Sequence, residues 1–196
     1  MRADLTHVEQ WIEPNSHVLD LGCGDGTLLS QLKETKNIFD CGLEIDNDRI
    51  NTCLAKGINV IQQDLDKGLA NFETDSFDTV VLTQTLQAVK HPDKLVEEML
   101  RVGKRCIISF PNFGYWRYRM YLLFKGRMPM SPHLPDTWYD TPNIHFCTVN
   151  DFDDFCRQNN IKVLQRQVLD YKYKSSAVMN INPNFLGINA TYHISR

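Results

Sequence analysis

The chain has 196 residues, of which 42% are hydrophobic and 23% charged, and its formal net charge is −3. This length and composition predict a single domain over residues 1–196 and exclude a disordered or collagen-like chain. The sequence contains no apolar run of about 18 residues and no secretory signal, so we expect a cytoplasmic protein with no membrane partner. The six cysteines form no CxxC pair, which predicts reduced thiols and no metal site.

Short apolar runs alternate with helical patterns through the first half of the chain. The apolar runs predict strands at residues 17–21, 38–45, 58–62, 77–83 and 104–110. Helices are expected between them at residues 27–34, 46–56 and 92–103. Asp46 and Pro92 are typical of helix starts, and Gly57 and Gly103 are typical of helix ends. This alternation indicates an α/β fold with a parallel sheet covered on both faces.

The pattern changes after the fifth predicted strand. Residues 111–147 contain five of the eight prolines and many aromatic residues, and the segment is too long for a structureless loop. We expect it to form a small cap inserted into the domain. Thr148 or Asn150 then begins another helix. Residues 161–171 and 188–196 predict two strands joined as an antiparallel hairpin at one edge of the sheet.

Three glycines lie between the first strand and the first helix, in the sequence DLGCGDG at residues 20–26. Glycines at this position let a ligand approach the backbone closely, and ligands of open α/β sheets bind at the carboxyl ends of the strands. The dinucleotide pattern GxGxxG is not met, because the glycines give GxGxG and Thr27 follows them. A nicotinamide-dependent oxidoreductase is therefore only a third alternative.

Three carboxylates accompany this glycine turn, which we define as residues 22–26. Glu44 ends the second predicted strand and is placed to accept hydrogen bonds from both hydroxyls of a ribose. Asp64 follows the third strand and is placed for an adenine amino group, while Asp20 precedes the glycines and can meet a cationic group. Three acids suit a ligand with a sulfonium and an amino group, and they disfavour a pyrophosphate. The indicated cofactor is S-adenosylmethionine, or its product S-adenosylhomocysteine.

The segments VLDLGCGDG, GLEID, QQDL and FDTVVLTQTLQAV resemble the class I S-adenosylmethionine-dependent methyltransferases, over nearly the whole chain. The resemblance implies a Rossmann-like fold with a mostly parallel seven-stranded sheet and an antiparallel C-terminal hairpin. It also implies that residues 83–87 line the cofactor and acceptor side. The cofactor-binding residues that it implies are Asp20, Gly22, Cys23, Gly24, Gly26, Glu44, Ile45, Asp64, Leu65 and Thr83.

A closer resemblance is carried by TQTLQAVKHP, SFPNFGYWRYRMYLLFKGRMP and WYDTPNIHFCT. These segments are similar to the MetW family of methionine biosynthesis proteins, and the match includes the expected cap. The family is associated with the homoserine O-acyltransferase of methionine synthesis. The resemblance therefore implies this enzyme as a partner.

No catalytic residue is assigned, because methyl transfer from a sulfonium can depend on positioning of the acceptor alone. An amine or hydroxyl acceptor would often need a nearby base. Candidates for that base, none of them in a recognisable pair, are His91, His133, His145, Tyr115, Tyr139 and Asp140. Residues 83–86 offer no aromatic clamp for a flipped base, and the net charge is negative, so we expect no nucleic acid partner.

Positive charge is concentrated in one part of the chain. Residues 101–127 hold seven Lys or Arg and no acid, whereas the rest of the chain holds 14 basic and 24 acidic residues. As a helix, residues 113–127 present two faces, one with Trp116, Met120, Leu123 and Phe124 and the other with Arg117, Tyr121 and Lys125. One interpretation is a helix that covers the active site with a solvated basic face. A second is a docking surface for an acidic partner. A third, which the net negative charge disfavours, is a surface that binds a membrane or a nucleic acid.

Two functions of different classes follow from these observations. The one that we favour is an accessory or regulatory subunit of the acyltransferase, which keeps the S-adenosylmethionine site and could use it as a sensor. The alternative is an active methyltransferase that acts on a small molecule bound under the cap.

Overall fold

A computed structural model describes residues 5–132, 134–171 and 174–196 of the chain. Its strands are β1 (His17–Leu21), β2 (Phe39–Glu44), β3 (Val60–Gln62), β4 (Phe77–Thr83), β5 (Gly103–Pro111), β6 (Lys162–Leu169) and β7 (Asn189–Ser195). Its α-helices are α1 (Leu5–Glu9), α2 (Thr27–Lys36), α3 (Asn47–Ala55), α4 (Pro92–Val102), α5 (Trp116–Lys125), α6 (Val149–Gln158), α7 (Ala177–Ile181) and α8 (Pro183–Leu186). Two 3-10 turns, η1 (Leu65–Lys67) and η2 (Leu86–Ala88), follow β3 and β4.

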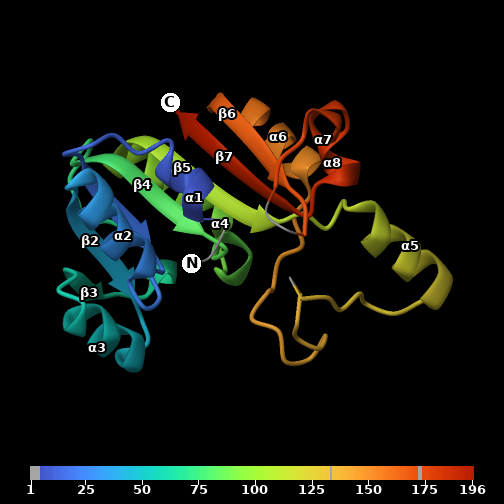
Figure 1. Ribbon diagram of the computed structural model, residues 1–196, viewed down its shortest axis with the longest axis horizontal. Helices are drawn as coiled ribbons and strands as arrows, with labels where there is room; N and C mark the ends of the chain where they lie inside the picture. Colours follow the sequence, from blue (N-terminus) through green and yellow to red (C-terminus); the bar gives the residue numbers. More distant parts are fainter. Residues whose placement is uncertain (1–4, 133, 172–173) are drawn as a thin grey trace.

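The strands form one seven-stranded sheet in the order β3-β2-β1-β4-β5-β7-β6 (Figure 1). The pairings among β1 to β5 are parallel, and β7 is antiparallel to both β5 and β6. The strand order reverses between β1 and β4, at the glycine turn. Such a reversal is where ligands of doubly wound sheets bind, because the connections on either side diverge there.

Helices cover both faces of the sheet, so its central strands are apolar on both sides. In β4, Val80 and Leu82 belong to the core cluster that includes residues of α4 and α6. Val81 belongs instead to the cluster that includes residues of α1, α2 and α3. Neighbouring side chains of a strand point to opposite faces, so one apolar run supplies both cores. This arrangement confirms the predicted α/β fold class.

The C-terminal hairpin is confirmed, with β7 inserted between β5 and β6. Between β6 and β7 in the chain lie α7 and α8, which the sequence pattern did not predict. Each begins at a polar cap: the Ser176 side chain accepts from the Met179 N–H, and the Asn182 side chain accepts from the Phe185 N–H. Helices of five and four residues are too short to show a repeating apolar stripe, so caps were their only signal.

The 111–147 segment leaves the sheet at the end of β5 and returns at α6. Its helix α5 projects away from the sheet (Figure 1). Tyr118, buried in a small cluster with Tyr115 and Leu134, attaches the helix, whereas Leu123 and Phe124 are 69% and 76% exposed. No described residue of this segment lines the cavity at the glycine turn. The interpretation of a helix covering that site is therefore not supported.

Asn112 holds the base of the segment in place and is fully buried. Its Nδ2 donates to the backbone oxygens of Asn184 at 2.9 Å and Gly187 at 2.7 Å. Its Oδ1 accepts from the backbone N–H of Gly114 at 2.9 Å and of Val149 at 3.2 Å. One amide thus joins the end of β5, the start of α6 and the turn before β7.

Within the described residues, no helix is both long and apolar enough to cross a membrane.

Replacing Asn112 with alanine should lower the free energy of unfolding by about 3–5 kcal/mol, because three buried backbone groups and one partly buried one lose their partner. Chemical denaturation monitored by circular dichroism measures this change. Asn150→Ala, an exposed position on α6, is the matched control and should change stability by less than about 0.5 kcal/mol. Equal effects of the two substitutions would contradict the role assigned to Asn112.

Candidate functional site

A cavity of about 460 Å³ lies at the carboxyl ends of β1 and β4, beside the glycine turn. It is lined by Asp20, Gly22, Cys23, Gly24, Asp25, Thr27, Leu28, Arg49, Thr83, Gln84 and Thr85. Five of the ten predicted cofactor residues are therefore brought together here: Asp20, Gly22, Cys23, Gly24 and Thr83. The Asp20 side chain is buried at the end of β1, where a carboxylate favours a cationic group.

The three glycines of the turn all have positive φ, and two of them are also confined by their neighbours. A Cβ on Gly22 would lie 3.0 Å from Thr85 Oγ1, and one on Gly26 would lie 3.0 Å from Cys53 Sγ. A Cβ on Gly24, at φ +60°, would meet no atom within 4 Å. The protein itself therefore requires Gly22 and Gly26, whereas Gly24 leaves open space beside the cavity.

Cys23 packs beneath the turn rather than reacting in it. A Cβ on Gly42 of β2 would come within 2.5 Å of Cys23 Sγ, so the strand makes room for this thiol. Burial, followed by the charge of Asp20, raises the pKa of Cys23 far above its usual range. A neutral, buried thiol is a poor nucleophile, so Cys23 acts as a small core residue.

Glu44 is buried at the end of β2 and ties the second βα unit to the glycine turn. Its Oε2 accepts from the Gly24 N–H at 2.9 Å. Its Oε1 accepts from the N–H groups of Ile45 at 2.8 Å and Asp46 at 3.1 Å. Arg49 of α3, which lines the cavity, lies 3.9 Å from Glu44 Oε2. Glu44 thus stands at the edge of the cavity and also shapes its wall.

Four other predicted residues are not among those that line this cavity: Gly26 of the turn, Ile45 directly after β2, and Asp64 and Leu65 after β3. Ile45 is 59% exposed beside Glu44. Asp64 is half-buried, and its side chain accepts from the Asp66 N–H at 3.0 Å as the cap of η1, which begins at Leu65. Gly26 lies on the helix side of the turn. Asp20, Glu44 and Asp64 therefore differ in their relation to the cavity: the first lines it, the second borders it and the third lies outside its lining.

An ion pair closes the other end of the turn. Lys56 Nζ donates to Asp25 Oδ2 at 2.9 Å and to the backbone oxygen of Asp25 at 2.7 Å. The hydrogen bond from Lys56 lowers the pKa of Asp25 to about 2. Any stability that this pair contributes is present above the ordinary Asp pKa and is lost as the pH falls through about 2. The pair is exposed to solvent, so its contribution is small.

Some lining residues were absent from the predicted set. Thr27 and Leu28 open α2 directly after the turn, and their position next to Gly26 could have indicated them. Arg49 is different, because it reaches the cavity from α3 only after the chain has folded back along the sheet. No spacing pattern in the sequence connects it to the glycines.

None of the described candidate bases lines this cavity. His91, His145, Tyr115, Tyr139 and Asp140 all lie elsewhere. His133 falls outside the described residues. Within the described part of the chain, no group of three or more His, Cys, Asp or Glu could hold a metal ion.

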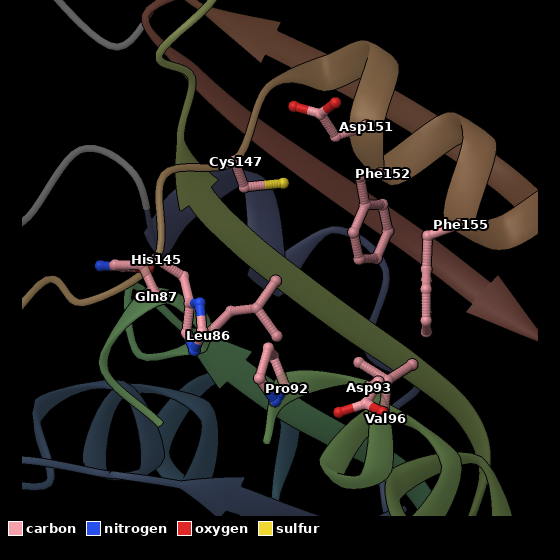
Figure 2. A pocket seen from close by; sticks show the side chains of 10 residues that line it. All are labelled: Leu86, Gln87, Pro92, Asp93, Val96, His145, Cys147, Asp151, Phe152 and Phe155. Carbon is pink, nitrogen blue, oxygen red and sulfur yellow. The ribbon is translucent and has the colours of Figure 1, made fainter. Parts of the chain in front are cut away.

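A second, smaller cavity of about 210 Å³ lies between α4 and α6. Figure 2 shows Phe152 and Phe155 of α6 pointing toward Pro92 and Val96 of α4. None of the predicted cofactor residues lines it. Its lining is mostly apolar and includes Gln87 of η2, so η2 separates it from the cavity at the glycine turn.

The fold and the glycine-turn cavity define a protein of the class I methyltransferase fold. A solved S-adenosylmethionine-dependent methyltransferase from Archaeoglobus fulgidus superposes with a TM-score of 0.72 at 15% identity, over 99% of this chain and 92% of that one. Another, from Mesorhizobium loti, gives a TM-score of 0.71 at 16% identity, over 99% and 98% of the two chains. At these identities the likeness establishes the fold alone.

The family is established by sequence. Residues 2–194 match the family model described as "Methionine biosynthesis protein MetW", and the chain belongs to this family. A curated relative from Rhodopirellula baltica, "Bifunctional methionine biosynthesis protein MetXA/MetW", is 38% identical over 172 residues. The match covers 83% of this chain but only 28% of that relative, so the chain spans less than a third of the relative's length. The predicted resemblance to MetW is confirmed.

Glu44→Ala should lower the free energy of unfolding by about 2–4 kcal/mol, because three N–H groups around a buried carboxylate lose their acceptor. Asp64→Ala, which removes the cap of a short turn, should cost about 1 kcal/mol. Urea denaturation of both variants checks the difference. An equal or smaller loss for Glu44→Ala would show that its hydrogen bonds do not hold the turn.

Proposed function

We propose that this protein binds S-adenosylmethionine at the glycine turn and serves as an accessory or regulatory subunit of the homoserine O-acyltransferase of methionine synthesis. The observation that carries the first part is the cavity that Asp20 and Gly24 share at the reversal of the strand order. The second part rests on the MetW family and on its fused relative.

The donor and acceptor groups of the cavity fit an adenosyl sulfonium compound. Asp20 is a buried carboxylate that suits the amino group of the methionine moiety. The open space at Gly24 lets a ligand pass against the backbone. When bound, S-adenosylmethionine supplies an electrophilic methyl group on a sulfonium. The chain's own contribution is to bind and orient that group.

Glu44 has room to bind fewer ribose hydroxyls than the sequence indicated. A carboxylate offers about four lone-pair positions, and three backbone N–H groups already use Glu44. One position remains, so we expect Glu44 to accept from one ribose hydroxyl rather than from two. The free position is on Glu44 Oε2, and Arg49 lies 3.9 Å from this oxygen. Arg49 must therefore share Oε2 with the ribose or move when a ribose binds.

The name of the R. baltica relative joins MetXA and MetW in one chain, and the segment that matches this protein is 28% of it. Two units fused in one relative are candidates for association when they are separate. The MetW resemblance implies the acyltransferase as the MetX partner. These two arguments together support a partner role for this protein.

The structure also offers a connection between the cavity and the 111–147 segment, through which a bound ligand could alter partner affinity. Gln84 lines the cavity, and its backbone oxygen accepts from Gln87 Nε2 at 2.8 Å. The backbone oxygen of Gln87 in turn accepts from the N–H groups of Ile144 at 2.9 Å and His145 at 3.0 Å. A displacement of the Gln84 backbone on ligand binding would therefore reach the 111–147 segment through two successive sets of hydrogen bonds.

Gly24→Ala should weaken S-adenosylmethionine binding by about tenfold, which corresponds to about 1.4 kcal/mol, because its methyl group takes space that the ligand needs. Gly57→Ala is the matched control. Gly57 also has a positive φ and open space where a Cβ would lie, but it does not line the cavity. Both variants should lose about 1–2 kcal/mol of stability from backbone strain. Calorimetric titration with S-adenosylmethionine measures the affinity of both variants. If both bind it as tightly as the original chain does, the assignment of this ligand to the cavity is wrong.

The partner role is tested by affinity pull-down from the native cell and by titration with the purified acyltransferase. We expect a complex whose dissociation constant changes by about 5- to 150-fold when S-adenosylmethionine is added. Equal partner affinity with and without the ligand would remove the sensor role. If nothing copurifies and methyl transfer to a small molecule is detected, the protein is instead an active methyltransferase.

A further inference from the structure

Helix α5 exposes three large apolar side chains in succession near its C-terminal end. Leu122, Leu123 and Phe124 are 51%, 69% and 76% exposed. Isolated apolar residues are common on protein surfaces, but consecutive exposed ones promote association unless they serve a function. Exposed apolar patches of this kind mark interaction sites. Met128 and Met130, which follow the helix, are also exposed.

These exposed residues lie near the end of a helix that is held to the domain at Tyr118 and Arg119. Tyr118 is buried, and its hydroxyl lies 3.0 Å from Ser131 Oγ. Arg119 Nε donates to the Gly114 backbone oxygen, and its guanidinium lies 5.8 Å from the centre of the Phe185 ring. Arg119 is therefore held against the base of α5 by these two contacts.

Three other cations of this part of the chain have no carboxylate partner among the described residues. Arg117, Lys125 and Arg127 are exposed and form no ion pair within the described ranges. Arg117 lies 5.4 Å from the ring centre of Trp116, which keeps its guanidinium close to the helix. An apolar centre with a charged rim is the usual anatomy of a protein interface.

We propose that the exposed C-terminal part of α5, residues 122–125, together with Arg117 on the helix and Arg127 after it, is the docking surface for the acyltransferase; these residues are called the α5 surface. The complementary surface is an apolar groove edged by carboxylates. This inference rests on the proposed function for the identity of the partner. The large apolar side chains supply the central contacts, and the cations select the orientation of the partner and speed its association.

Charge decides between this partner and two other occupants of the α5 surface. A second copy docked through the α5 surface would place Arg117, Lys125 and Arg127 against their own counterparts, and like charges at close range disfavour that contact. An anionic membrane would attract the three cations, but the chain outside residues 101–127 holds 14 basic and 24 acidic residues and would be repelled. A separate protein with a small acidic surface would contact the three cations alone, without placing the acidic remainder of the chain against an extended anionic surface.

The apolar contact is tested with Phe124→Asp. We expect its dissociation constant for the purified acyltransferase to rise by about 30-fold, the loss typical of a central contact residue. Leu54→Asp is the matched control, because Leu54 is a helical residue with 57% exposure on α3. The dissociation constant of Leu54→Asp for the acyltransferase should lie within about twofold of that of the original chain. Both variants should keep the melting temperature, since both side chains are exposed.

The charged rim is tested by replacing Arg117, Lys125 and Arg127 together with Glu. We expect slower association and a weaker dependence of the association rate on salt. The control variant replaces Lys67, Lys94 and Lys162 with Glu, which makes the same change in net charge at exposed positions outside α5. Its rate of association with the acyltransferase should be nearly that of the original chain.

The outcomes separate this inference from the proposed function. A complex that forms with unchanged affinity for Phe124→Asp would overturn the docking surface while leaving the partner role intact. No complex with the original chain would overturn both. Sedimentation that shows a dimer dissociated by Phe124→Asp would assign the α5 surface to a second copy. Binding to phosphatidylglycerol vesicles that Phe124→Asp abolishes would assign it to a membrane.

Discussion

Glu44 accepts hydrogen bonds from three backbone N–H groups, and the shape of the candidate site depends on this one carboxylate. The Gly24 N–H brings the glycine turn to the end of β2, and the Ile45 and Asp46 N–H groups fix the start of the next helix. The ends of β1 and β2 are thereby joined by side-chain contacts as well as by the sheet. A turn that is held in this way can present its backbone to a ligand without closing on itself.

The candidate binding cavity and the proposed docking surface lie in different parts of the structure. The cavity lies at the reversal of the strand order, whereas α5 projects away from the sheet beyond the end of β5 (Figure 1). Asn112 anchors the base of the 111–147 segment by four hydrogen bonds. Rigid attachment matters here, because a helix that presents apolar residues to a partner loses less entropy on binding when it is already ordered.

The fold by itself does not determine what such a protein does, since one fold supports many functions. This chain contains a segment, residues 111–147, that is rich in aromatic residues, and the chain as a whole belongs to the MetW family of methionine biosynthesis proteins. The proposed ligand site and the proposed docking surface, present in one domain, would suit a component that responds to a small molecule and transmits the response to a partner. The hydrogen bonds from Gln84 through Gln87 to residues 144 and 145 would give the proposed response a physical route.

The sequence by itself determined the fold class, the location of the glycine turn and most of the strand positions, because these follow from local patterns. Apolar runs, helix caps and turn glycines act over a few residues and can be recognised without knowing the partners. Only the tertiary structure decided that Arg49 reaches the cavity, that Asp64 caps η1 outside its lining, and that α5 buries Tyr118 while exposing Leu123 and Phe124. These features depend on which surfaces meet after the chain folds back on itself. The spacing of residues within one helix shows which side chains share a face, but it cannot show whether another part of the protein covers that face.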